Sequence, residues 1–117
     1  MDGFPDSSNR MPTHLWVEAE VRRLLSEGYG VYVNARGDRA GGLVIQKIAD
    51  MAGSARVLVQ QRDAGGRLVW MNALEDDVVA ERDADSYIAR AVDRDPDLWV
   101  VEIEDRQMRF PLLTAPA

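Results

Sequence analysis

The sequence predicts an α+β domain, with an antiparallel sheet of about five to six strands and two helices on one side of it, in the order α-β-β-β-β-α-β-β. Three observations support this prediction. Residues 13–27 carry a helical apolar stripe, residues 29–74 contain short β-branched segments joined by Gly- and Asp-rich loops, and a second helical stripe precedes a further strand near the C-terminus. Residues 1–11 lack periodicity and are predicted to be a disordered N-terminal tail, which leaves residues 12–117 as a single domain.

The first helix is predicted to begin at Thr13, whose hydroxyl can cap the helix, and to run to about Glu27. Its stripe consists of apolar residues at helical spacing: Val17, Val21, Leu24 and Leu25. Gly28 should end the helix because glycine adopts the left-handed conformation without a steric penalty.

The second helix is predicted in the later half of residues 75–95. Asp83 or Asp85 can cap its start, and Pro96 closes it because proline cannot continue a helix. Four residues at helical spacing form its apolar stripe: Ala84, Tyr87, Ile88 and Ala91. This helix separates the first four strands from the C-terminal ones.

The first four strands are predicted at residues 29–36, 42–50, 55–62 and 66–74. Each consecutive pair is joined by a short loop, so the prediction pairs them as hairpins. Apolar residues occur at successive positions, which breaks a strict alternation of buried and exposed side chains. A sheet covered on both faces, for example by a second subunit, accounts for this pattern.

The acid-flanked segment 93–106 has two interpretations. Its acidic residues partly match a calcium-binding loop, but Leu98 occupies the position where such loops need glycine, and residues 98–103 are typical of a strand. We therefore predict a strand whose Trp99, Val101 and Ile103 side is buried. A partner strand is predicted within residues 106–113, with Phe110 opposite Ile103 on the core side and Glu104 opposite Arg109.

Composition excludes several classes of chemistry. The chain has no cysteine, which rules out disulfides and thiolate chemistry, and its net charge of −6 makes it an acidic protein and argues against nucleic-acid binding. No apolar run is long enough to cross a membrane and no signal-peptide pattern opens the chain, so a cytoplasmic protein is expected. No catalytic residue, metal ligand set or cofactor motif is assigned.

The loop "RGDRAGG" (36–42) is the main candidate binding feature. Its glycines and arginines could present N–H groups and positive charge to a phosphate, although a hairpin turn explains the same composition. Lys47 could add an amine, or could simply direct its ammonium group to water or to a carboxylate. The tentative binding residues are Arg36, Gly37, Asp38, Arg39, Gly41, Lys47, Trp99 and Glu102.

Three segments together resemble a known bacterial family: "PTHLWVEAEVRRLLSEG", "RGDRAGG" and "DPDLWVVEIEDR". The chain is similar, over roughly residues 12–113, to the family catalogued as domain of unknown function 1491. The resemblance implies a small single-domain bacterial protein and supplies no activity, substrate or cofactor. The positions that fit the family pattern are Trp16, Arg36, Gly37, Asp38, Ala40, Gly41, Asp95, Pro96, Asp97, Leu98, Trp99, Glu102 and Asp105.

Two functional hypotheses follow. The first is a non-enzymatic binding or assembly module that forms a homodimer, because potential nucleophiles and metal ligands are few and apolar residues occupy both faces of several strands. The alternative is a protein that handles a small molecule or a nucleotide phosphate through the Arg36–Gly42 loop and Lys47, joined by Glu102.

Overall fold

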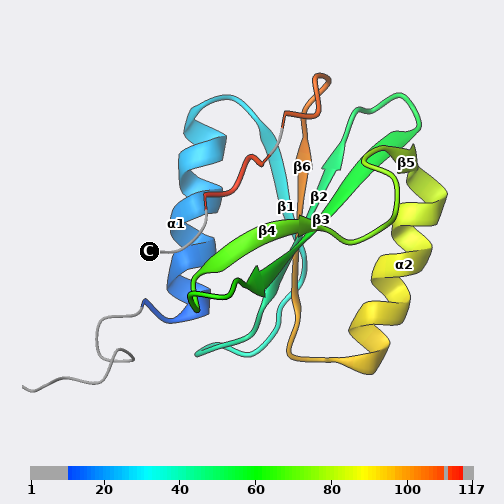
Figure 1. The fold of residues 1–117 in the computed structure, drawn as a ribbon. Helices are drawn as coiled ribbons and strands as arrows, with labels where there is room; N and C mark the ends of the chain where they lie inside the picture. Colours follow the sequence, from blue (N-terminus) through cyan, green and yellow to red (C-terminus); the bar gives the residue numbers. More distant parts are fainter. Residues whose placement is uncertain (1–10, 110, 115–117) are drawn as a thin grey trace, which may run out of the picture.

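The computed structural model describes residues 11–109 and 111–114. These residues form, in chain order, α1 (Thr13–Ser26), β1 (Gly30–Ala35), β2 (Val44–Ala49), β3 (Ser54–Arg62), β4 (Leu68–Asn72), β5 (Val79–Ala80), α2 (Glu81–Arg94) and β6 (Trp99–Glu104). Within them, six strands form one sheet in the order β1-β6-β2-β3-β4, with β5 paired to β3 (Figure 1). The α+β class, the two helices and a mostly antiparallel sheet are thus confirmed.

The two helices lie on opposite faces of the sheet, so the prediction that both lie on one side is wrong (Figure 1). Alternate residues of β6 contact different helices: Trp99 packs in a cluster with α1, whereas Val100 packs in a cluster with α2. All six residues of β2 are buried, as expected for a strand covered on both faces. Helix α2 of the same chain therefore supplies the second cover that the sequence pattern required.

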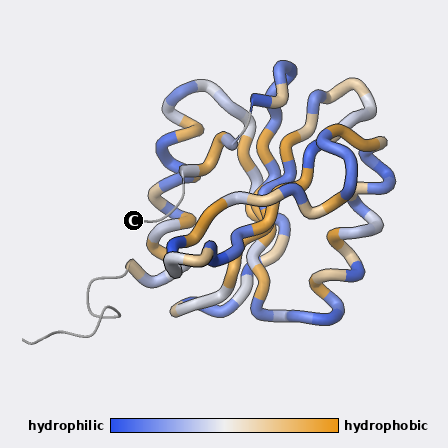
Figure 2. Tube along the Cα trace, viewed as in Figure 1, coloured by the Kyte–Doolittle hydropathy of each residue, from blue (hydrophilic) through white to orange (hydrophobic). Residues whose placement is uncertain are grey.

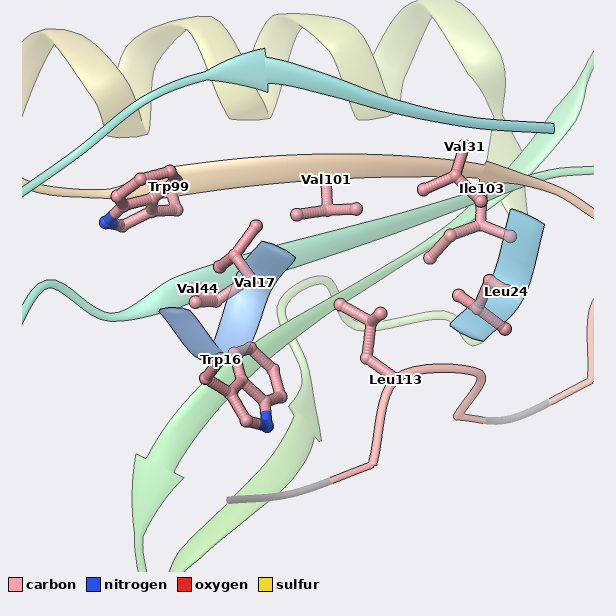
Figure 3. Close-up of a cluster of buried hydrophobic side chains, with 9 residues drawn as sticks. All are labelled: Trp16, Val17, Leu24, Val31, Val44, Trp99, Val101, Ile103 and Leu113. Carbon is pink, nitrogen blue, oxygen red and sulfur yellow. The ribbon is translucent and has the colours of Figure 1, made fainter. Parts of the chain in front are cut away.

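The main hydrophobic cluster lies between α1 and the sheet, and Figure 3 shows how its side chains converge. Its members come from α1, three strands and the C-terminal segment: Trp16, Val17, Leu24, Val31, Val44, Trp99, Val101, Ile103 and Leu113. As predicted, the Trp99, Val101 and Ile103 side of β6 is buried. Figure 2 shows the corresponding concentration of hydrophobic residues along the strands in the middle of the molecule.

Strand β6 lies between β1 and β2, which corrects the predicted hairpin between these two strands. It pairs antiparallel with β1 and parallel with β2, so that Lys47 is the register partner of Glu102. The 36–42 segment is therefore a connection that passes the start of β6. The β3–β4 pair, in contrast, is antiparallel as predicted.

The predicted C-terminal partner strand is not present in residues 105–109 and 111–114; Phe110, its expected core residue, lies outside the described residues. The Asp105 carboxylate accepts hydrogen bonds from the backbone N–H groups of Gln107 and Arg109, at 3.2 and 2.9 Å, which forms a turn. Arg109 thus contacts Asp105 rather than Glu104. Residues 111–114, which we call the C-terminal strap, reach the α1 face, where Leu113 is buried.

Helix boundaries agree with the predictions within a few residues, but the caps differ. Gly28 has the expected left-handed conformation, with φ of 96°. Thr13 does not cap α1 with its side chain; its hydroxyl donates to the Gly42 carbonyl instead. Leu25 is 53% exposed, so it does not belong to the buried stripe. Helix α2 begins before the two predicted caps, which leaves the Asp85 carboxylate free to bind elsewhere.

Candidate functional site

Lys47 lies in the middle of β2, with its side chain directed to the α2 face and only 4% exposed. Its ammonium group contacts three carboxylates: Glu81 at 2.8 Å, Asp85 at 2.7 Å and Glu102 at 3.5 Å. Two of these residues come from α2, and the third is the register neighbour on β6. We call these four residues the Lys47 cluster.

The cluster keeps Lys47 protonated. Burial alone lowers the pKa of this ammonium, but hydrogen bonds to Asp85 and Glu81 and the charge of Glu102 outweigh burial, and the net pKa is raised above its ordinary value. An amine becomes a nucleophile or a general base only after losing its proton. At neutral pH Lys47 is therefore a fixed positive charge that links α2 to the sheet.

Glu102 is held from both sides. Lys47 approaches it from β2, and the side-chain amide of Asn34 on β1 donates a hydrogen bond to it at 2.7 Å. The β1–β6 pairing shifts register between Val33 and Ala35, which marks a bulge at Asn34. Through Asn34, this bulged edge strand places a polar side chain beside the Lys47 cluster.

An open cleft of about 370 Å³ lies beside the cluster, between α2 and strands β1, β2 and β6. We call it the α2 cleft. Its lining combines aliphatic residues with two carboxylates, one amide and the buried ammonium: Asn34, Ala35, Lys47, Asp85, Ile88, Ala89, Val92, Asp93 and Val100. Such a lining suits a ligand that has both an aliphatic part and a positive charge.

Sequence reasoning missed most of the residues that form this site. It proposed Lys47 and Glu102, which the structure brings together, but not Glu81, Asp85 or Asp93. A usable signal existed, because Glu81 and Asp85 are four residues apart and therefore share one face of a helix. The predicted start of α2 was too late for this spacing to be recognised.

The 36–42 loop lies where β1 leads to β2, against the start of α1 and the residues that precede β6. Its Arg39 and Ala40 carbonyls accept hydrogen bonds from the first N–H groups of α1, which thereby receive a backbone cap. A Cβ atom on Gly37 or Gly42 would lie 2.0 or 2.1 Å from the Asp97 carbonyl oxygen. These two glycines therefore allow close approach of two backbone segments.

Several polar groups of this loop already have partners within the protein. The Asp38 N–H donates to the Asp97 carbonyl, and the Asp38 carboxylate accepts a hydrogen bond from the Gly41 N–H. The Asp38 carbonyl accepts the indole N–H of Trp99 at 2.8 Å. These contacts favour a structural role for the loop over the presentation of its N–H groups to an anion.

Arg36 and Trp99 lie away from Lys47. The Arg36 guanidinium lies 5.1 Å from the centre of the Trp99 ring, and this indole is buried on the α1 face of β6. Lys47 is on the opposite face, in contact with α2. The structure therefore joins Lys47 to Glu102 but does not join either residue to the arginines of the loop.

Two buried glutamines and a tryptophan form a further polar feature, on the α1 face of β2, β3 and β4. The Gln46 side-chain oxygen accepts the N–H groups of Leu112 and Leu113, and that of Gln60 accepts the Val44 N–H. The side-chain N–H groups of Gln46, Gln60 and Trp70 have no hydrogen-bond partner among the described residues. The Gln46 contacts hold the strap against β2, and the Gln60 contact joins β3 to the start of β2.

Residues 11–109 and 111–114 contain neither a metal-ligand cluster nor a membrane-spanning helix. No group of three or more histidine or acidic side chains there is arranged to hold a metal ion. Neither of the two helices in this part of the chain is long and apolar enough to cross a membrane.

The fold and the site define a small α+β domain in which two helices enclose a mixed sheet, with a lysine–carboxylate cluster in the wall of a cleft. The chain belongs to the DUF1491 family of proteins of unknown function, whose profile matches residues 11–113. This confirms the resemblance found in the sequence. No characterised, curated protein matches the chain.

Solved structures of similar proteins support the same assignment. The crystal structure of a DUF1491 family protein from Caulobacter crescentus CB15 is 37% identical, with 91% of this chain and 97% of that chain covered and a TM-score of 0.79. The NMR structure of a DUF1491 family protein from the same organism gives 37% identity, coverage of 91% and 94%, and a TM-score of 0.77. Protein Atu0922 from A. tumefaciens, at 23% identity, coverage of 91% and 94% and a TM-score of 0.72, shares the fold.

Proposed function

We propose that this protein is a non-enzymatic binding module that holds a small cationic ligand with an aliphatic part in the α2 cleft. The observation that carries the proposal is the Lys47 cluster, in which one ammonium is surrounded by three carboxylates at the wall of the cleft. Asp93 also lines the cleft, so the four carboxylates and one ammonium of this region carry a formal charge of three negative units. A positively charged ligand would be attracted, and an anion repelled.

The protonation of Lys47 supports a non-enzymatic role. Lys47 was the candidate nucleophile of the sequence, and its raised pKa keeps the amine lone pair bound to a proton at neutral pH. The Glu102 carboxylate accepts a hydrogen bond from Asn34 and lies 3.5 Å from the Lys47 ammonium, so it already has polar partners within the protein. Binding, rather than proton transfer, is the chemistry that this arrangement favours.

We assign the aliphatic part of the ligand from the apolar lining of the α2 cleft. Ile88 and Val92 of α2 and Val100 of β6 line it with methyl groups. Burial of a short alkyl chain against these residues contributes roughly 0.8 kcal/mol per methylene group. A linear alkylamine or diamine fits both requirements, because it combines an alkyl chain with an ammonium group.

The proposal includes self-association as a homodimer and action in the cytoplasm. Support for self-association comes from β4, a strand at the sheet edge that carries no charged residue. The apolar pattern of the strands no longer supports it, because α2 accounts for that pattern. The absence of cysteine fits a reducing compartment.

Thermal unfolding in the presence of small ligands tests the cleft. We expect 1,4-diaminobutane to raise Tm in a concentration-dependent way, because ligand binding stabilises the folded state by mass action. Butyrate and inorganic phosphate should not raise it. Stabilisation by phosphate without stabilisation by the diamine would overturn the proposal and support the alternative that uses the Arg36–Gly42 loop.

A matched pair of variants locates the binding. Asp93→Asn removes a carboxylate that lines the cleft, whereas Asp83→Asn makes the same chemical change on the same helix outside the cleft lining. We expect Asp93→Asn to weaken diamine binding about two- to fivefold, as suits an exposed charge, and Asp83→Asn to leave it unchanged. Equal effects of both variants would indicate attraction by net charge alone and would remove the cleft from the proposal.

A further inference from the structure

Strand β4 forms one end of the sheet, and none of the described residues pairs with its outer edge (Figure 1). Its sequence, LVWMN, contains no charged residue and no proline. Proteins commonly protect such edges with charges, prolines or bulges. Strand β1, at the other end, carries a bulge between Val33 and Ala35, whereas the β3–β4 pairing is regular. The β1 edge is therefore interrupted by a bulge, whereas the β4 edge is regular and uncharged.

The backbone of β4 shows which groups face outward. The Ala73 N–H donates to Val57, and the Arg67 carbonyl accepts from Asp63, so odd-numbered residues direct their backbone groups inward, toward β3 and the β3–β4 turn. Because the direction alternates along an antiparallel strand, Leu68 and Trp70 direct their N–H and C=O groups to the open edge. The same alternation applies to Asn72. The edge therefore offers three outward residues centred on Trp70.

The side chains of β4 also suit a contact. Leu68, Val69 and Trp70 are half-buried, and Met71 is 46% exposed. An apolar strand with unpaired backbone groups is the usual template for addition of another strand.

Charge at the two ends of β4 favours a second copy of the same chain in antiparallel orientation. Exposed Arg62 and Arg67 lie at the end where β4 begins, together with Asp63, whose carboxylate accepts N–H groups of the turn. Exposed acidic residues follow the other end: Glu75, Asp76 and Asp77. A twofold axis places the basic end of one copy beside the acidic end of its partner, twice. Parallel association would place like charges together.

We propose that two copies of this chain pair through antiparallel β4 edges, with Trp70 at the twofold axis and Leu68 opposite Asn72 of the partner. This deepens the proposed function and rests on its self-association. In this register the outward residues form hydrogen-bonded pairs, because each offers both an N–H and a C=O group to the partner. The sheets of two protomers become one continuous sheet.

Light scattering and introduced cysteines test self-association and this surface separately. Light scattering on the unmodified chain shows whether a dimer exists. Leu68→Cys and Asn72→Cys variants are then mixed under oxidising conditions; the natural chain has no cysteine, so each carries a single thiol. Opposed residues of a hydrogen-bonded pair lie about 5.5 Å apart between Cα atoms, within disulfide range. We expect cross-links in the mixture and not in either variant alone.

A backbone variant provides a second measurement that does not depend on cysteine geometry. Leu68→Pro removes an outward N–H at the first residue of β4, a position where proline is tolerated in an edge strand. Leu68→Ala is the control, since it shortens the side chain but keeps the N–H. We expect the dimer dissociation constant of Leu68→Pro to be at least about tenfold higher than that of Leu68→Ala, because two hydrogen bonds are lost per dimer.

The outcomes separate the two proposals. A strict monomer at all concentrations would overturn self-association and, with it, the edge assignment. A dimer that forms no cross-link in the mixture, or responds equally to Leu68→Pro and Leu68→Ala, would leave self-association standing and overturn the β4 surface. Cross-links within a single variant would overturn the register.

Discussion

The two faces of the sheet are built differently. On the α1 face the helix buries Trp16, Val17 and Leu24 against an apolar cluster that also contains Leu113 of the C-terminal strap. On the α2 face the helix fully buries only two alanines, and a charged cluster and an open cleft lie beside them. Small residues at the contact allow α2 to pack, but they leave space along its flank. The α1 face therefore supplies most of the core, and the α2 face supplies the site.

The largest effect that tests this comparison comes from two adjacent valines of β6. Val101 is fully buried on the α1 face, and Val100 is equally buried on the α2 face but lines the cleft. We expect Val101→Ala to reduce the free energy of unfolding by about 2–3 kcal/mol, because it leaves a closed cavity. Val100→Ala should cost about 1 kcal/mol, since solvent and cleft residues can occupy the vacated space. Urea denaturation measures both.

Each valine variant is the control for the other, because the same side-chain atoms are removed at neighbouring positions of β6 and only the face of the sheet differs. Equal costs for the two variants would contradict the comparison and would mean that the α2 face is packed as tightly as the α1 face. Unchanged urea m-values would show that neither variant alters the surface exposed on unfolding.

The next effect concerns the charged cluster. Lys47→Met removes the ammonium and leaves three carboxylates close together; we expect a loss of about 2 kcal/mol at pH 7, less than for a fully buried pair because the carboxylates reach solvent. The raised pKa of Lys47 means that its contribution is fully present below the unfolded-state pKa near 10.4 and is lost as pH rises through the folded-state value. The gap between wild type and variant should thus be constant from pH 6 to 9 and narrow above about pH 10.4.

Lys47→Arg is the control for charge, because it keeps a cation at the same position. We expect it to recover part of the stability lost in Lys47→Met. A variant Lys47→Met as stable as wild type at pH 7 would show that α2 is held by apolar contacts alone.

The sequence was informative where the pattern is local. The alternation of Trp99, Val101 and Ile103 identified the buried side of β6, because residues two apart on a strand share a face. The stop at Gly28 followed from its left-handed conformation. The strand order did not follow, since periodicity states which side of a strand is buried and not which strand lies beside it. The position of β6 between β1 and β2 depends on contacts between residues that are far apart in the sequence.

The failure at the C-terminus has a specific physical cause. Segment 106–113 was predicted to pair as a strand, but the Asp105 carboxylate accepts hydrogen bonds from two backbone N–H groups and Met108 adopts a positive φ of 45°. This local turn directs the chain away from β6 and toward α1. A side chain that bonds to nearby backbone groups competes with strand pairing, and here it prevails.

The site was only half predictable for a related reason. Lys47 and Glu102 stood out as charged residues in apolar strands, and they proved to be neighbours. Their α2 partners are 34 and 38 residues from Lys47 in the chain, and no local pattern links such positions. Loop 36–42 was predicted as a binding loop because of its glycines. The same glycines permit the close backbone contact with Asp97, so the sequence pattern fits a structural role equally well.

The smallest effect concerns how the α1 face is closed. The Glu20 carboxylate accepts hydrogen bonds from Arg23 and from the N–H and hydroxyl of Thr114, so it fixes the strap on α1. Burial raises the pKa of Glu20, but these hydrogen bonds outweigh it and the net pKa is lowered. A lowered pKa contributes stability above the unfolded-state pKa near 4.3, and this stability is lost as pH falls through the folded-state value.

Glu20→Gln should therefore reduce the free energy of unfolding by about 1 kcal/mol at pH 7, and the difference from wild type should shrink toward pH 3. Glu18→Gln is the matched control: the Glu18 side chain is 52% exposed and lies 3.7 Å from His14, so we expect a change near zero at both pH values. Hydrogen exchange would show faster opening of the strap amides, at Leu112 and Leu113, in Glu20→Gln. Exchange there at the wild-type rate would mean that Gln46 on the sheet and Arg23 on α1, which donates to the Leu112 carbonyl at 2.9 Å, hold the strap without Glu20.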